Sequence, residues 1–207
     1  MATAVSAAKT VVTRRDHLLE TALRLFNTHG FHATGIDKVQ AESGVSKTTM
    51  YKYFKSKDEL IQAVLERRHQ QFGEWITARI NVLSEDKYAG LAEGKLLALF
   101  DTLDEWFHTE TFCGCNFINA SAEYTELMNP IHKIATDHKL SLADYISTLI
   151  PDLEHGDRDE LAKEICLLVD GAIVCAHTVG IKDSAERAKR MSLLLLKELG
   201  LVSALNA

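Results

Sequence analysis

A short segment rich in lysine and hydroxyl side chains, SKTTMYKYFKSK at residues 46–57, has the chemistry to bind an anion. Ammonium groups and hydroxyls donate hydrogen bonds to phosphate oxygens and to the edges of nucleic-acid bases. Charge is unevenly spread, because residues 1–70 hold 11 Lys or Arg against 7 Asp or Glu, and residues 71–207 hold 12 against 22. A basic first third in a chain of net charge −6 predicts that this end contacts a polyanion such as DNA.

Apolar spacing and capping residues place this segment on a short helix that follows another short helix. A first helix is expected from Thr13 to Gly30, a second is capped by Thr34 and ends at Gly44, and a third is capped by Ser46. Two short helices joined by a glycine-containing turn are typical of a helix-turn-helix, whose second helix enters the major groove of DNA.

The rest of the chain also follows a helical period. Ser56 with Glu59 forms a capping box for a long fourth helix, whose apolar stripe reaches Leu83. Further helices are expected over residues 91–108, 130–151, 157–179 and 184–199, with proline or glycine at several of their ends. We therefore predict an all-α protein.

The run TGIDKVQAESGVSKTTMYKYFKSKDEL, with LLETALRLFNTHGFHAT before it, resembles the DNA-binding region of the TetR family of transcriptional regulators. The resemblance covers about a third of the chain, and it departs from the family at Gln40, where a small Ala is usual. It implies an N-terminal three-helix DNA-binding domain with a helix-turn-helix, followed by a helical ligand-binding and dimerisation domain. The expected division is a flexible arm at 1–12, the helix-turn-helix domain at 13–57 and the effector-binding and dimerisation domain at 58–207.

The resemblance also implies roles for individual residues of the basic segment. Lys47, Thr48 and Lys52 fall where such proteins read bases or adjacent phosphates. Ser46, at the start of its helix, is expected to expose backbone N–H donors to phosphate. Backbone phosphates are the expected partners of Thr34, Thr49, Tyr51, Tyr53 and Lys57.

The expected partners are double-stranded operator DNA, a second copy of the chain in a homodimer, and a small-molecule effector that releases this repressor from DNA. An effector pocket is expected between the middle helices, lined by Trp106, Phe107, Cys113, Asn116, Phe117, Asn119, Tyr124 and His177. The last two helices are expected to form the dimer interface through Leu161, Ile165, Leu168, Ala172, Ala176, Met191 and Leu195.

The Cys113-Gly114-Cys115 triplet raises an alternative, a repressor that responds to thiol oxidation. Buried, unreactive thiols are the favoured interpretation, since free cysteine is commonly buried. Residues two apart on a regular helix point to different sides, and His132 and His138 add no zinc-ligand spacing. We expect no metal and no cofactor.

An enzyme is the alternative from a different class of protein. The sequence contains no nucleotide-binding loop, no HExxH pair and no GxSxG elbow, so catalysis is not expected. No apolar run approaches the roughly 18 residues of a membrane span, and the first residues lack the apolar core of a secretory signal. Together these features predict a cytoplasmic protein that does not enter a membrane.

Overall fold

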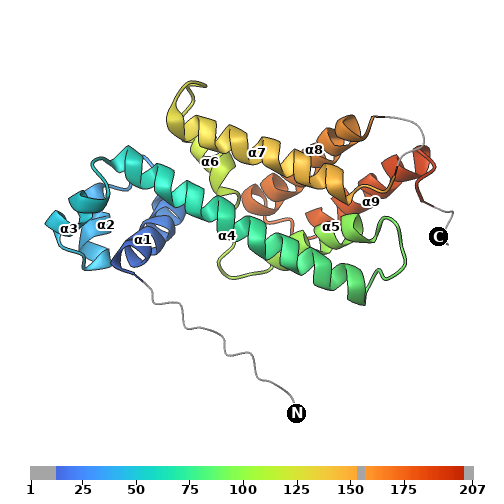
Figure 1. The fold of residues 1–207 in the computed structure, drawn as a ribbon, viewed down its shortest axis with the longest axis horizontal. Coiled ribbons are helices and arrows are strands. Elements are labelled where there is room, and N and C mark those ends of the chain that lie inside the picture. Colours follow the sequence, from blue (N-terminus) through green and yellow to red (C-terminus); the bar gives the residue numbers. More distant parts are fainter. Residues whose placement is uncertain (1–12, 153–156, 203–207) are drawn as a thin grey trace, which may run out of the picture. The chain divides into compact units, whose positions relative to one another are not determined.

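The computed structural model describes residues 13–152 and 157–202, and all regular elements within these ranges are α-helices (Figure 1). The predicted all-α fold is confirmed, while the predicted arm at 1–12 lies outside the described residues. The helices are α1 (Arg14–His29), α2 (Ile36–Ser43), α3 (Lys47–Tyr53), α4 (Lys57–Asp86), α5 (Gly94–Phe107), α6 (Asn116–Glu123), α7 (Pro130–Leu149), α8 (Arg158–Thr178) and α9 (Ser184–Glu198).

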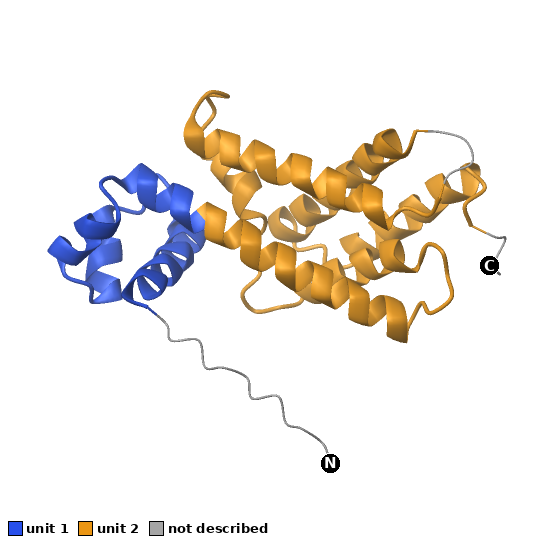
Figure 2. Ribbon diagram, viewed as in Figure 1, with its two compact units in different colours: residues 1–64 blue, residues 65–207 orange. Residues whose placement is uncertain are grey.

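The chain forms two compact units that meet within α4 (Figure 2). Unit 1 ends at Val64, and unit 2 begins at Leu65. The boundary expected from the sequence lies earlier, between residues 57 and 58 at the start of the same helix. Because Leu60 and Ile61 at the start of α4 are fully buried, this part of the helix belongs to a hydrophobic core.

Unit 1 is a small helical core in which α1 packs against α2. Leu18 and Phe26 of α1, Val39 of α2 and Met50 of α3 supply its buried apolar side chains. Gly44, with φ +64°, makes the left-handed turn between α2 and α3, a conformation that costs glycine little. The geometry of the predicted helix-turn-helix is therefore present.

Three of the four predicted caps in unit 1 are confirmed, including Ser56 before α4, whose hydroxyl accepts a hydrogen bond from the Glu59 backbone N–H. Thr13 and Asp16 form a reciprocal capping box at α1, and the Ser46 hydroxyl accepts a hydrogen bond from the Thr49 backbone N–H. The prediction for α2 was wrong, because its N-cap is Gly35 and no side chain caps it. Thr34 is instead buried beside the turn.

Unit 2 is a bundle in which α5 packs against α7, α8 and α9, and α6 packs against α7. Most residues of α5 between Leu96 and Phe107 are buried. A cluster around Asp101 fastens this helix to its surroundings, since its carboxylate accepts hydrogen bonds from Lys189 of α9 (2.6 Å), Lys87 (2.7 Å) and the Tyr88 hydroxyl (2.6 Å).

Two features of unit 2 differ from the sequence interpretation, the start of one helix and the presence of another. The helix expected from residue 91 begins at Gly94, where an added Cβ would lie 2.8 Å from the Tyr88 carbonyl oxygen, so only glycine fits this approach. α6 was not predicted, because its start follows the left-handed Gly114 and carries no side-chain cap. None of the described helices is long and apolar enough to cross a membrane.

Candidate nucleic-acid interface and effector domain

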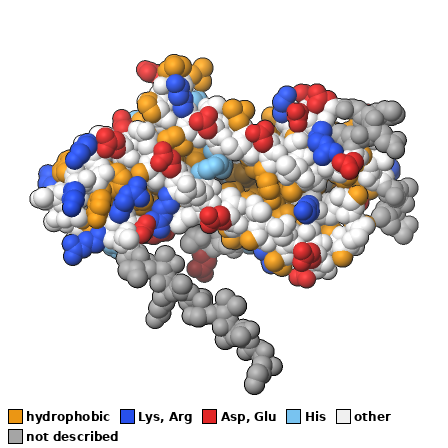
Figure 3. Space-filling model, in the orientation of Figure 1, with side chains coloured by type: hydrophobic (Ala, Val, Ile, Leu, Met, Phe, Trp, Pro, Cys, Tyr) orange, Lys and Arg blue, Asp and Glu red, His pale blue; other side chains and the backbone are white. Residues whose placement is uncertain are grey.

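α3 is partly buried in unit 1 and partly exposed to solvent. Met50 and the following Phe54 are buried, four residues apart on one face. Lys47, Thr48 and Lys52 are exposed. The residues expected to read bases are thus free to meet a ligand from outside the protein, and Figure 3 shows Lys and Arg side chains over unit 1.

Two lysines of this region are already held by oxygen atoms of unit 1. Lys47 Nζ lies 3.3 Å from Asp37 Oδ1, and both side chains are mostly exposed. Such a surface ion pair is worth about 0–1 kcal/mol, so a phosphate can replace Asp37 at small cost. Lys57 Nζ donates to the His32 carbonyl oxygen (2.9 Å), which fixes its ammonium group near the turn before α2.

Tyr51 and Tyr53 are each 38% exposed, and Thr49 is half-buried because it also takes part in the Ser46 cap. Their phenol and hydroxyl groups stay available as candidate phosphate contacts. The Ser46 hydroxyl is committed to the helix start, which leaves the backbone N–H groups of the first turn of α3 as its contribution to the surface.

Thr34 does not lie where the sequence interpretation placed it. Its side chain is 1% exposed, and its hydroxyl donates to the Gly30 carbonyl oxygen at 2.7 Å. A hydroxyl buried in this way stabilises the turn after α1 and does not reach a phosphate. Gln40, the departure from the family pattern, donates its amide N–H to the Val45 carbonyl oxygen (2.9 Å) and so ties α2 to the turn before α3.

The residues expected to line an effector pocket divide into three groups. Trp106, Phe107, Asn116, Phe117 and Tyr124 are buried, Cys113 and Asn119 are half-buried, and His177 is exposed with its ring against Gly114. Most of this set therefore forms protein core. Of the eight, Phe117 lines a described cavity, a groove of about 360 Å³ between α6, α7 and α8.

Phe117 connects this groove to α4 through two histidines. Its ring stacks on His138 of α7 with centroids 3.5 Å apart, and His138 Nδ1 lies 2.9 Å from His69 Nδ1 of α4. Since both atoms are imidazole nitrogens, one must carry the proton and the other must accept it. Burial, with smaller contributions from Lys139, His69 and Arg68, lowers the pKa of His138 to about 3.

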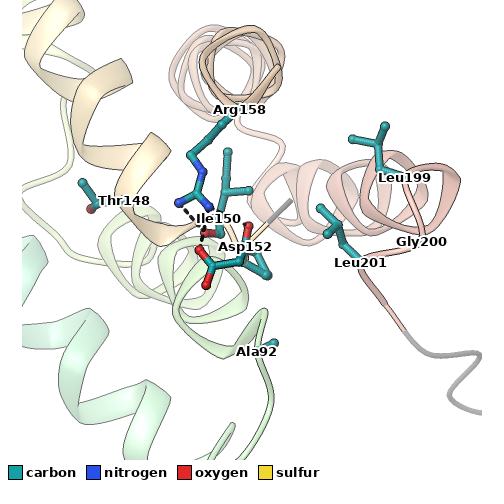
Figure 4. Close-up of a pocket in the computed structure, with 9 residues that line it drawn as sticks. Ala92, Thr148, Ile150, Asp152, Arg158, Leu199, Gly200 and Leu201 are labelled. Atoms are coloured by element: carbon teal, nitrogen blue, oxygen red, sulfur yellow. Dashed lines mark hydrogen bonds and ion pairs between the residues drawn. The ribbon is translucent and has the colours of Figure 1, made fainter. Parts of the chain in front are cut away.

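A larger cavity of about 730 Å³ lies at the other end of α7, between Thr148, Arg158 and Leu201 (Figure 4). Arg158 points toward Asp152 and donates to its carboxylate at 2.9 Å, as well as to the Ile150 and Pro151 carbonyl oxygens. Arg158 and Asp152, two polar residues that line this cavity, are thus already hydrogen-bonded within the chain. Residues 153–156, which follow Asp152, lie outside the described part of the structure.

The predicted dimer interface on α8 needs a correction. Leu161, Ile165, Ala172 and Ala176 are 0–4% exposed, so they belong to the interior of a single protomer. The small residues permit a close helix approach, as expected, but the helices that approach belong to the same chain. Of the other predicted residues, Met191 is exposed, and Leu168 and Leu195 are partly exposed.

A different face of α8 and α9 carries apolar side chains into solvent. Leu167 is 73% exposed and Leu194 is 62% exposed, with Val174 and Met191 beside them along the two helices. Gly171 lies between Leu167 and Val174, and apart from its immediate neighbours and the backbone of its own helix, no described part of the chain lies within 4 Å of where its Cβ would be. Packing within the protomer therefore does not explain a glycine in the middle of this helix.

Comparison with known proteins agrees with the geometry of unit 1. Residues 18–64 match the family model described as bacterial regulatory proteins, tetR family. The HTH-type transcriptional regulator YjdC of Escherichia coli K12 is 28% identical over 160 residues, 77% of this chain and 81% of that protein. A crystal structure of SCO4454, a TetR-family regulator from Streptomyces coelicolor, superposes with a TM-score of 0.78 at 27% identity, over 90% of this chain and 95% of that one.

The chain belongs to the TetR family of transcriptional regulators. It is also similar to the HTH-type transcriptional repressor NemR of Escherichia coli K12, 30% identical over 114 residues, 55% of each protein. As a TetR-family regulator it is a DNA-binding protein, and α3 is the second helix of its helix-turn-helix.

The thiols of this TetR-family chain lie in surroundings that favour the protonated form where a pKa shift is resolved. Burial raises the pKa of Cys113, which Arg68 opposes in part, and burial raises that of Cys166 to about 11. Cys115 is buried at the start of α6, and Cys175 is exposed on α8. No group of three or more His, Cys, Asp or Glu side chains among residues 13–152 and 157–202 is arranged to hold a metal.

Sequence reasoning missed the His69–His138 contact, which joins residues 69 positions apart. The sequence offers no spacing signal for such a pair, because the contact arises only when α4 and α7 fold against each other. The exposed apolar face of α8 did carry a signal, since Leu167, Gly171 and Val174 recur at helical spacing.

Proposed function

We propose that this TetR-family protein is a homodimeric repressor that binds a pseudo-palindromic operator and is released by a small-molecule effector. The observation that carries the proposal is the exposure of Lys47, Thr48 and Lys52 on α3, while Met50 and Phe54 anchor the helix in the core. Such a helix can lie in a major groove with its ammonium and hydroxyl groups toward base edges and phosphates. Transcription takes place on the chromosome, so we place this regulator in the cytoplasm.

Two copies are needed because helix-turn-helix proteins read paired half-sites about one DNA turn apart. The apolar face of α8 and α9 around Leu167, Gly171 and Leu194 supports an isologous interface, in which each copy contributes the same surface. The missing side chain at Gly171 leaves room for a helix of the second copy to approach closely.

Release requires that the effector bind one conformation of the dimer better than another. α4 is the element that can report this difference, since a single helix supplies residues to both units. An effector held in unit 2 that shifts α4 would change the spacing of the two recognition helices and lower the affinity for the operator.

A gel-shift titration with the DNA that flanks its own gene tests the function. Binding should survive excess unrelated competitor DNA and should weaken with salt, since each neutralised phosphate contributes about −0.9 to the slope of log affinity against log salt concentration. A helical enzyme without a regulatory role would not bind this DNA selectively. Binding that ignores salt, or that unrelated DNA abolishes, would contradict the proposal.

A further inference from the structure

The groove between α6, α7 and α8 has an apolar wall and two polar ends. Phe117, Ile118 and Leu140 supply the wall, while His132 lies at one end and Lys139 with Asp170 at the other. His132 and Lys139 are seven residues apart on α7, which is two helical turns on the same face, or about 10.5 Å along the axis. The groove thus presents two fixed hydrogen-bonding groups separated by apolar surface.

The hydrogen bonds already present determine what each end can offer. His132 Nδ1 lies 2.6 Å from the Tyr124 carbonyl oxygen, which can only accept, so Nδ1 carries the proton. In the neutral ring, Nε2 is then an acceptor. Lys139 Nζ donates one hydrogen bond to Asp170 Oδ1 at 2.5 Å, and an ammonium group has three donors. One end of the groove therefore accepts, and the other donates.

Asp170 also sets the charge of the donor end. Its carboxylate neutralises Lys139 in a partly shielded site, so a ligand carboxylate placed there would lie against a second negative charge. A neutral carbonyl oxygen can accept from Lys139 without this repulsion. The ion pair therefore favours an uncharged ligand at this end.

From this arrangement we infer that the groove binds an uncharged molecule about 10 Å long, with an apolar ring, a hydroxyl at one end and a carbonyl at the other. The hydroxyl donates to His132 Nε2, the ring packs on Phe117 and Ile118, and the carbonyl oxygen accepts from Lys139. The role of this ligand as the effector rests on the proposed function, whereas its binding does not.

A ligand on this wall acts directly on a contact of α4. Phe117 forms part of the groove and stacks on His138, which is hydrogen-bonded to His69 of α4. A ring packed against Phe117 would favour one position of Phe117 and His138 over others. The same ligand should therefore weaken operator binding, which deepens the proposed function by naming the chemistry of its effector.

The test uses para-hydroxybenzylacetone, a phenol with a ketone on a short chain, and the full-length protein without DNA in isothermal titration calorimetry. Two analogues each remove one polar end: para-methoxybenzylacetone lacks the O–H donor, and para-butylphenol lacks the carbonyl. Each should bind roughly tenfold more weakly, as expected for the loss of one hydrogen bond. The anionic analogue para-hydroxyphenylpropanoate should also bind more weakly than the ketone.

Two matched variants place the ligand in the groove. Thr136 is exposed and lines the groove, and Ser141 is exposed on the same helix outside it, while both hydroxyls donate to the carbonyl oxygen four residues earlier. Thr136→Phe should fill the groove and weaken binding of para-hydroxybenzylacetone at least tenfold, whereas Ser141→Phe should bind it like the wild type. Circular dichroism checks that both variants stay folded.

Equal binding of the ketone and both analogues, no binding of any of them, or wild-type affinity in Thr136→Phe would overturn the inference. Calorimetry without DNA separates this outcome from failure of the proposed function. Selective operator binding by a protein that ignores the ketone would reject the groove ligand alone. Ketone binding by a protein that fails the gel-shift test would reject the repressor alone.

Discussion

His138 shows how a single buried side chain links the fold to pH. Its ring is enclosed between Phe117 and His69. Its pKa falls from the ordinary 6.5 to about 3, because burial and the neighbouring Lys139 and Arg68 disfavour a positive charge on this imidazole. The unfolded chain binds a proton at this histidine more readily than the folded chain does. Stability from this group is therefore present above about pH 6.5 and is lost as the pH falls toward 3.

Between pH 7 and pH 5, this histidine alone should lower the free energy of unfolding by about 2 kcal/mol. In His138→Phe the titrating group is gone and an aromatic ring still faces Phe117, so that part of the pH dependence should disappear. Urea denaturation at both pH values measures the difference. His108→Gln, which removes an exposed histidine, is the control and should keep the pH dependence of the wild type. Identical pH dependence in His138→Phe would show that the ring is not held neutral.

Individual side chains of α3 should separate base reading from phosphate binding. Lys47→Ala or Thr48→Ala should cost about 1–3 kcal/mol of operator affinity and relax the preference at one operator position. Tyr51→Phe or Lys57→Ala should weaken all sequences alike, because a phosphate contact carries no base identity. Binding to a library of operator variants distinguishes the two patterns, and unchanged preference in both of the first two variants would move the reading surface elsewhere.

At the scale of elements, the helix starts that carry a capping side chain were mostly predicted correctly. Thr13, Ser46 and Asn129 each cap their own helix as expected. Thr34 misled the interpretation, because a threonine before a helix can cap it or bury its hydroxyl in the preceding turn, and the sequence is the same in both cases. For a similar reason, the sequence interpretation assigned the buried face of α8 to the dimer interface. Small residues permit a close approach of helices both within a chain and between chains.

The exposed stripe on α8 predicts how to disrupt the proposed dimer. Gly171→Leu adds a side chain where the protomer has free space, and it replaces a helical glycine, which is worth about 0.8–1 kcal/mol to the helix. We expect a folded protomer of unchanged or higher melting temperature that no longer dimerises. Sedimentation velocity measures the mass. Gly73→Leu is the matched control, because Gly73 also lies in a helix with nothing within 4 Å of its Cβ position, and it should remain a dimer. A dimeric Gly171→Leu protein would place the interface on another surface.

At the scale of the whole molecule, the sequence provided more information about the DNA-binding unit than about the proposed effector groove. The basic first third, the helix-turn-helix and the all-α fold could be predicted, because charge, caps and helical period are local features. The groove could not, since it brings together Phe117, His132 and Asp170 from three helices. The His69–His138 contact escaped prediction for the same reason.

The proposed release of the protein from DNA should not be triggered by an oxidant. The raised pKa of Cys113 leaves little thiolate at neutral pH, and thiolate is the reactive form. Peroxide at concentrations that oxidise exposed thiols should therefore leave operator binding unchanged, in the wild type and in Cys113→Ser/Cys115→Ser alike. Gel shifts before and after treatment measure this. Release of the wild type but not of the folded double variant would make thiol oxidation the signal.

α4 is an unbroken helix of 30 residues, and the two compact units meet inside it. Each residue of a helix turns the chain by about 100°, so inserting or deleting one residue near Val64 would rotate the downstream apolar stripe out of phase with the upstream one. Substitutions that keep the stripe leave this phase intact. A chimaera that combines unit 1 with unit 2 of another such regulator should therefore be joined within α4 at matched positions, so that the helix keeps its number of residues.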